Sequence, residues 1–142
     1  HTKSIQLVDS VPTSVYQKLR SKLPFVNLIQ VVHVLDQNAI EEAIAIAPLV
    51  DALLLDSGNP NLDIKELGGT GRIHNWELSK EIVDRVETPV FLAGGLSPLN
   101  IIKAYEQVNP YGFDLCSGVR TNGKLDEKKL KKFFDTLENN FC

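Results

Sequence analysis

The chain has 142 residues, a length typical of one globular domain, so we expect residues 1–142 to form a single domain. Hydrophobic residues make up 43% of the chain and charged residues 23%, a composition that excludes a disordered or fibrous protein. The net charge of −3 provides no basic surface, so we expect neither nucleic acid nor a membrane as a partner.

Five short runs rich in Val, Ile, Leu and Phe predict β-strands over residues 4–8, 26–34, 51–55, 89–93 and 112–116. Several runs are continuously apolar, which is typical of parallel strands covered on both faces. A segment with helical periodicity follows each run, with apolar stripes over residues 15–23, 40–47, 78–86, 101–108 and 130–141. Strict alternation of strand and helix predicts an α/β protein with a parallel sheet.

Polar residues mark several expected helix starts. Ser97 followed by Pro98 predicts an N-cap and a first helical residue, and Asp36, Asn75 and Asp126 are further N-cap candidates.

No secretory signal is visible and the two cysteines lie far apart in the chain, so we expect a cytoplasmic protein with reduced thiols.

The connection after the third predicted strand is longer than the others, with a loop from Ser57 to about His74. Long loops in compact domains are usually functional, and α/β folds bind ligands at the carboxyl ends of their strands. We therefore expect the functional site at this rim of the sheet.

Glycine-containing turns follow the last two predicted strands, with Gly94-Gly95 after the fourth and Ser117-Gly118 after the fifth. Glycine lets an anion approach backbone N–H groups closely. Barrels built from parallel strands and helices often bind phosphate at the loops after their last two strands. Such glycines also form plain tight turns, but two sites at consecutive strand ends favour a phosphate site.

Asp56 ends the third predicted strand, where burial would favour the protonated carboxyl group that a general acid needs. Asp56 could instead cap a helix or anchor the loop, and Asp114 could orient the turn after it. We interpret Cys116 as a buried, inert thiol and Trp76 as a packing residue. The three histidines lack the spacing of metal ligands, so we predict no metal site.

The ordered motifs resemble the phosphoribosylanthranilate isomerase family of tryptophan biosynthesis. They are Leu54-Leu55-Asp56, Gly68-Gly69-Thr70-Gly71, Trp76, residues 93–100, and Asp114 with Ser117-Gly118-Val119. The resemblance implies a (βα)8 barrel of the TIM type, with this chain as the C-terminal five of eight units. It implies an aldose–ketose isomerase that converts N-(5'-phosphoribosyl)anthranilate into a carboxyphenylamino deoxyribulose phosphate by an Amadori rearrangement, with no cofactor.

The resemblance also implies roles for individual residues. Asp56 would be the general acid that protonates the ribose ring oxygen, and Asp114 would be a substrate-binding residue. The phosphate would lie among Gly94, Gly95, Ser117 and Gly118. Gly69, Thr70 and Gly71 would also bind the substrate or its phosphate, at the backbone turns of the loop that lines or covers the mouth of the site.

The chain departs from the family pattern in ways that affect these roles. The family's general base, a cysteine on its first strand, and its arginine for the anthranilate carboxylate have no counterpart here. The family's Phe-Asp-Trp is His74-Asn75-Trp76 in this chain, and its Ser-Ser-Gly-Val-Glu is replaced by residues 116–120. We therefore expect the chain alone to be inactive, and we expect it to form a homo-oligomer through open sheet edges.

Two alternatives remain open at this stage. A different phosphosugar enzyme on the same scaffold would use Cys116 or His74 as a base and Arg120 to hold an anion. A phosphate-binding half-barrel without catalysis would serve only in assembly. Fold alone does not discriminate among these possibilities.

Overall fold

The computed structural model describes residues 2–58 and 73–141, so the candidate residues Gly69, Thr70 and Gly71 lie outside the described part. Its main feature is a five-stranded parallel sheet in which spatial order follows chain order. The strands are β1 (Ser4–Leu7), β2 (Asn27–His33), β3 (Ala52–Asp56), β4 (Val90–Leu92) and β5 (Gly112–Phe113). The predicted α/β fold with parallel βα units is confirmed.

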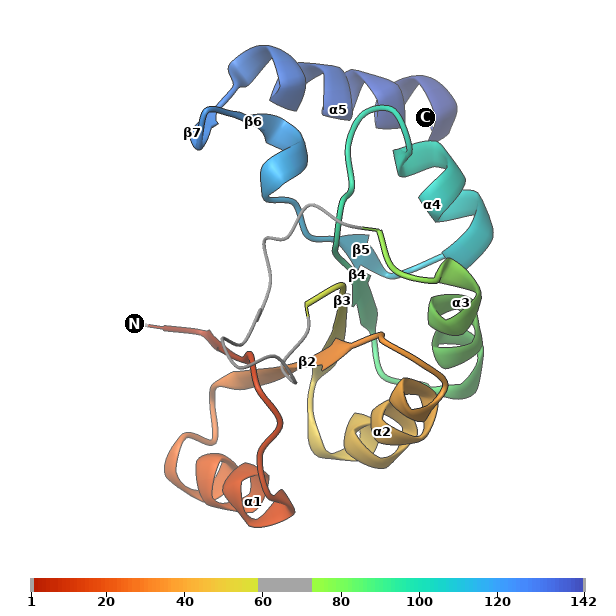
Figure 1. Ribbon diagram of the computed structural model, residues 1–142. Helices are drawn as coiled ribbons and strands as arrows, with labels where there is room; N and C mark the ends of the chain where they lie inside the picture. The colour runs from red at the N-terminus through yellow and green to blue at the C-terminus, as the bar shows by residue number, and fades with distance from the viewer. Residues whose placement is uncertain (1, 59–72, 142) are drawn as a thin grey trace.

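A helix follows each strand, and the helices form an arc along one face of the sheet (Figure 1). They are α1 (Thr13–Lys22), α2 (Asn38–Ile46), α3 (Trp76–Arg85), α4 (Ile101–Val108) and α5 (Glu127–Phe141), with short 3-10 helices η1 (Ala47–Leu49) and η2 (Ser117–Val119). Among the described residues, no helix is long and apolar enough to cross a membrane.

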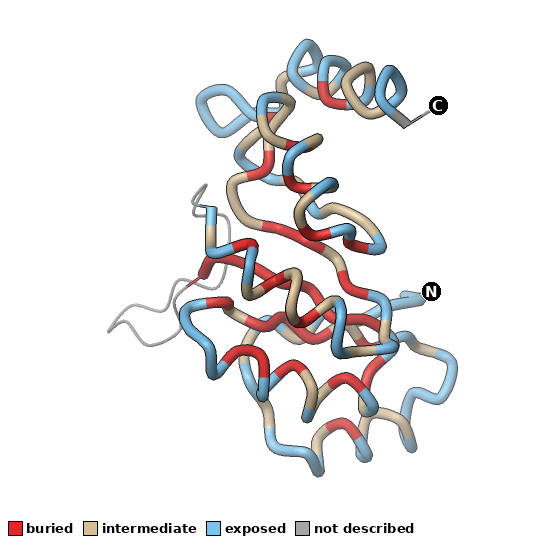
Figure 2. Tube along the Cα trace, turned by 90° about the vertical axis from the view of Figure 1, so that its right-hand side faces the viewer, coloured by how far each residue is buried: buried red, intermediate tan, exposed pale blue. Residues whose placement is uncertain are grey.

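Side chains pack on both faces of the sheet, as the continuously apolar strands predict. Val32, Leu55 and Leu92 join the large core that the helices cover, whereas Val31 and Leu54 belong to a smaller cluster on the opposite face. All of β3 is buried, and in Figure 2 the buried residues concentrate along the strands and the helix faces turned toward them. Burial on both faces holds the end of β3 in a fixed position.

A buried polar contact joins the first helix to the sheet. The Tyr16 hydroxyl donates a 2.7 Å hydrogen bond to Gln30 Oε1, and Gln30 is fully buried. Gln30 Nε2 in turn donates to three backbone oxygens, those of Leu7 and Asp9 at 3.1 Å and of Val31 at 2.9 Å. The amide thereby fastens the end of β1 to β2.

The predicted helix starts are partly confirmed. Asn75 caps α3 by accepting a hydrogen bond from Glu77 N at 2.9 Å, and Asp126 accepts from the backbone at the start of α5. The start predicted for α4 at Pro98 is wrong, because residues 98–100 form a turn and the helix begins at Ile101.

Two further differences concern the carboxyl-terminal part. The fifth strand ends at Phe113 and not at residue 116, because the chain turns into η2. A two-stranded hairpin, β6 (Arg120–Thr121) and β7 (Lys124–Leu125), precedes α5 and was not predicted. Asn122-Gly123 with positive φ at both residues is the usual signal for such a turn, and it is present in the sequence.

Candidate active site

Asp56 lies at the carboxyl end of β3 with only 6% of its surface exposed. It is the one carboxylate among the buried residues that the structure describes. Its carbonyl accepts a 3.0 Å hydrogen bond from Val34 N, and Leu55 O accepts a 2.8 Å bond from Ala93 N. Pairing on both sides therefore fixes the backbone that carries this carboxyl group.

The glycine loops after β4 and β5 pack directly against each other. Gly94 and Gly95 have φ of 82° and 64°, which glycine adopts without strain. A Cβ at Gly118 would lie 1.8 Å from Leu96 O, so only glycine permits this approach of the two loops. The structure thus brings both predicted glycine sites together at the rim.

Asn100 ties the first of these loops in place, a role that the sequence analysis missed. Its Oδ1 accepts from Ser97 N at 2.8 Å, and its Nδ2 donates to Gly95 O at 3.0 Å. These two bonds explain why α4 begins after Asn100, since the side chain closes the turn that precedes the helix.

Asp114 follows β5 at the level of Asp56, because Asp114 N donates to Leu92 O at 2.9 Å. Although the Asp114 side chain keeps contact with solvent, desolvation and the like charge of Asp56 raise the pKa of its carboxyl group. The raised pKa makes the protonated form of Asp114 more favourable than that of an ordinary exposed aspartate.

The charge of Asp56 also acts on His74, which lies in the segment before α3. Its Nε2 lies 2.7 Å from Ser79 Oγ, and its Nδ1 atom is buried and has no hydrogen-bond partner among the residues that the structure describes. Burial lowers the pKa of His74 to about 4, although the charge of Asp56 acts in the opposite direction. The imidazole is therefore neutral near pH 7.

Other candidates lie apart from these groups or differ from expectation. Cys116 is exposed, so its interpretation as a buried thiol is wrong, because β5 ends before it and no strand turns it inward. Trp76 is buried in the core as predicted. Arg120 is exposed and donates to Gly123 O within the hairpin. No three potential metal ligands converge among the described residues.

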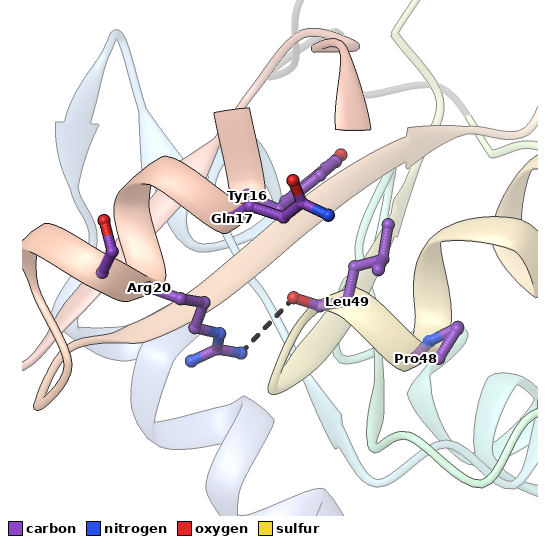
Figure 3. A pocket seen from close by; sticks show the side chains of 6 residues that line it. Tyr16, Gln17, Arg20, Pro48 and Leu49 are labelled. Atoms are coloured by element: carbon purple, nitrogen blue, oxygen red, sulfur yellow. Dashed lines mark hydrogen bonds between the residues drawn. The ribbon is translucent and has the colours of Figure 1, made fainter. Parts of the chain in front are cut away.

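An open groove of about 560 Å³ lies between α1 and η1, away from this rim. Arg20 lines it and donates to Leu49 O, as Figure 3 shows. The same guanidinium pairs at 2.7 Å with Asp51, which precedes β3 at the end opposite Asp56. Because its cation is already paired, the groove is a poorer anion site than the glycine loops.

A family model described as N-(5'-phosphoribosyl)anthranilate (PRA) isomerase matches residues 2–136. The chain belongs to this family. It is 37% identical over 131 residues to the N-(5'-phosphoribosyl)anthranilate isomerase of Methanocella arvoryzae, covering 92% of this chain and 59% of that protein.

Solved structures of family members are similar in fold to this chain. The phosphoribosyl anthranilate isomerase of Thermotoga maritima superposes with a TM-score of 0.76 at 28% identity, covering 96% of this chain and 62% of that one. A complex with reduced 1-(o-carboxyphenylamino)-1-deoxyribulose 5-phosphate has a TM-score of 0.73 at 25% identity, over 96% and 60% of the two chains. The chain thus spans about three fifths of the length of these relatives.

Proposed function

We propose that the protein containing this chain is an isomerase of tryptophan biosynthesis that rearranges N-(5'-phosphoribosyl)anthranilate to the carboxyphenylamino deoxyribulose phosphate. Family membership supports the reaction, and the observation that carries the site is the buried Asp56 beside the two packed glycine loops. We further propose that residues 1–142 act as one domain, which forms the C-terminal part of a barrel. We also propose that the protein is cytoplasmic.

In this proposal Asp56 is the general acid. Its Oδ–H bond breaks as the ribose ring oxygen takes the proton, and the ring opens to a Schiff base. The buried position of its side chain at the end of β3, at the same level as Asp114, supports this role. The second half of the rearrangement requires a separate proton acceptor.

We also propose a binding site for the phosphate of the substrate at Gly94, Gly95, Ser117 and Gly118. The positive φ values at Gly94 and Gly95 and the close approach of Gly118 to Leu96 support it. A dianionic phosphate at this point is held by backbone N–H groups, which need no charged side chain. Asp114, which follows β5 just before Ser117, is proposed to be a further substrate-binding residue.

Substitution of Asp56 by Asn in the full-length protein tests the assignment. Asn cannot donate the proton, so we expect kcat to fall about a hundredfold or more. Asp51→Asn is the matched control, because Asp51 precedes the same strand at its opposite end. Near-normal turnover by Asp56→Asn would refute the role of Asp56, and absence of isomerase activity in the unsubstituted protein would refute the proposed function.

A further inference from the structure

The turn after β4 contains three consecutive backbone N–H groups that make no hydrogen bond within the part of the chain that the structure describes. They belong to Gly94, Gly95 and Leu96. Leu96 is only 2% exposed, and the backbone N–H groups of buried residues are nearly always paired. An anion with several oxygen acceptors, such as a phosphate group, is the kind of ligand that consecutive N–H groups bind.

One side chain, that of Asn100, fixes the two peptide groups on either side of Leu96. Its Nδ2 donates to Gly95 O at 3.0 Å, and its Oδ1 accepts from Ser97 N at 2.8 Å. The first peptide group consists of Gly95 O and Leu96 N, and the second consists of Leu96 O and Ser97 N. Asn100 therefore sets the orientation of both peptide groups before any ligand binds.

The direction of the Leu96 N–H follows from these contacts. The described part of the chain has no cis peptide bond, and in a trans peptide group the C=O and the N–H point in opposite directions. Because Gly95 O points to Asn100, the Leu96 N–H points away from it. Leu96 O lies against Gly118, so this N–H is held at the junction of the two glycine loops.

The bond from Asn100 to Gly95 is separate from the contacts that start α4. The turn before the helix is closed by backbone bonds to Ser97 O, from Asn100 N at 3.2 Å and from Ile101 N at 3.1 Å. The Nδ2 bond reaches back to Gly95, which lies before that turn. Its specific effect is therefore on the peptide group that carries the Leu96 N–H.

We propose that Asn100 is a positioning residue for the phosphate site and that the Leu96 N–H is one of the donors of that site. By holding Gly95 O, Asn100 presents the Leu96 N–H to the phosphate together with the N–H groups of Gly94 and Gly95. A turn that is already ordered loses less conformational entropy when the anion binds. The inference rests on the proposed function, because it concerns the phosphate of the same substrate.

Kinetics of the full-length protein separate this role from a general loosening of the turn. Asn100→Ala removes both bonds, and we expect KM to rise about tenfold while kcat stays within about threefold of its original value. Asn100→Ser keeps a hydroxyl that can form one of the two bonds, so it should recover part of the loss.

Ser97→Ala is the matched control for these kinetics. It removes the hydroxyl that accepts from Leu99 N in the same turn and leaves both Asn100 bonds in place, so KM should change by less than about twofold. Urea denaturation checks that each variant is folded. Equal increases in KM for Ser97→Ala and Asn100→Ala, or an unchanged KM in folded Asn100→Ala, would overturn the proposal.

Amide NMR with ribose 5-phosphate as the probe tests the donors in the unsubstituted full-length protein without any need for turnover. At saturation we expect the amide proton resonances of Gly94, Gly95 and Leu96 to move downfield, because each N–H then donates to a phosphate oxygen. Asn100→Ala should raise the Kd for ribose 5-phosphate about tenfold. A Leu96 resonance that does not move at saturation, or an unchanged Kd in the variant, would contradict the assignment.

The same titration distinguishes failure of this inference from failure of the proposed function. Absence of saturable ribose 5-phosphate binding by the unsubstituted protein would refute the phosphate site and the role of Asn100 with it. Binding without isomerase activity would refute the proposed reaction alone. The Leu96 resonance and the Kd of Asn100→Ala would then decide the role of Asn100.

Discussion

Two carboxyl groups at opposite ends of β3 show how position decides the chemistry of a residue. Asp51, before the strand, is exposed and accepts hydrogen bonds from Arg20 and Leu28 N. Desolvation acts to raise the pKa of Asp51, but the hydrogen bonds and charge of Arg20 hold it below its ordinary value. Asp56, at the other end, is buried, and its charge acts on Asp114 and His74.

The low pKa of His74 predicts a loss of stability in acid. Above pH 6.5 His74 is neutral in both the folded and the unfolded state and contributes no pH dependence. As the pH falls from 6.5 toward the folded pKa of about 4, the unfolded chain binds a proton that the folded protein does not. We expect the free energy of unfolding to fall by about 2 kcal/mol between pH 7 and pH 5 from this group.

Chemical denaturation of the unsubstituted protein and of His74→Phe at both pH values measures this effect. The variant should lack that part of the acid loss. Asp114 and Glu42 have raised pKa values, so protonation of these groups stabilises the folded protein as the pH falls. Both groups are present in the unsubstituted protein and in the variant, so their effects cancel in the comparison. Equal acid sensitivity of the two proteins would contradict the prediction.

Gly118 and Gly123 provide a matched pair for the close approach of the glycine loops. Gly118→Ala forces its Cβ against Leu96 O, a backbone atom that cannot move aside alone, so we expect a loss of about 3 kcal/mol or more in unfolding free energy. Gly123→Ala meets open space and only the strain of a φ of 75°, for which about 1 kcal/mol is expected. Similar losses for the two variants, measured by urea denaturation, would disprove the steric argument.

Single polar contacts between elements decide how the helices and strands join. Asn75 and Asp126 are adjacent to the helices they cap, and both were identified from local sequence. Asn100 and Gln30 act across turns and strands instead. Asn100 delays the start of α4, and Gln30 holds the end of β1, neither of which follows from local propensity.

The contact between α1 and β2 predicts the effect of removing one hydroxyl. Tyr16→Phe leaves the buried Gln30 Oε1 without its donor, so we expect the free energy of unfolding to fall by about 1–3 kcal/mol. Tyr111→Phe is the control, because Tyr111 is 74% exposed and its variant should differ by less than about 0.5 kcal/mol. Thermal or urea unfolding of both variants measures the difference, and an unaffected Tyr16→Phe would show that the contact contributes no stability.

At the scale of the whole molecule, the parallel sheet has two unpaired edges among its described strands. β1 pairs only with β2, and β5 pairs only with β4. Unpaired edges expose N–H and C=O groups to which another chain can add. A sheet in this state favours association over a monomeric fold.

We therefore expect the isolated 142-residue chain to self-associate and to lack isomerase activity. Light scattering coupled to size exclusion measures the first, and a turnover assay the second. Gln6→Lys, which adds a charge on the exposed side of β1, should shift the chain toward monomers. A well-folded monomer with robust turnover would contradict both expectations.

The sequence by itself determined the alternation of strands and helices, the parallel sheet and the family. These depend on apolar periodicity and on ordered motifs, which are local properties of the chain. It also placed Asp56, Gly94-Gly95 and Ser117-Gly118 after predicted strands. Asn122-Gly123 carried a hairpin signal of the same local kind, although its significance became clear only in the structure.

Only the tertiary structure decided which side chains meet. It brought Gly118 against Leu96, set Ser79 against His74, left Cys116 exposed and buried Gln30 with Tyr16. The burial and the contacts depend on segments that are distant in the chain. The exposure of Cys116 depends on where β5 ends. Such quantities are properties of the packed molecule, because solvent exclusion at one residue is produced by its neighbours in space rather than by those in sequence.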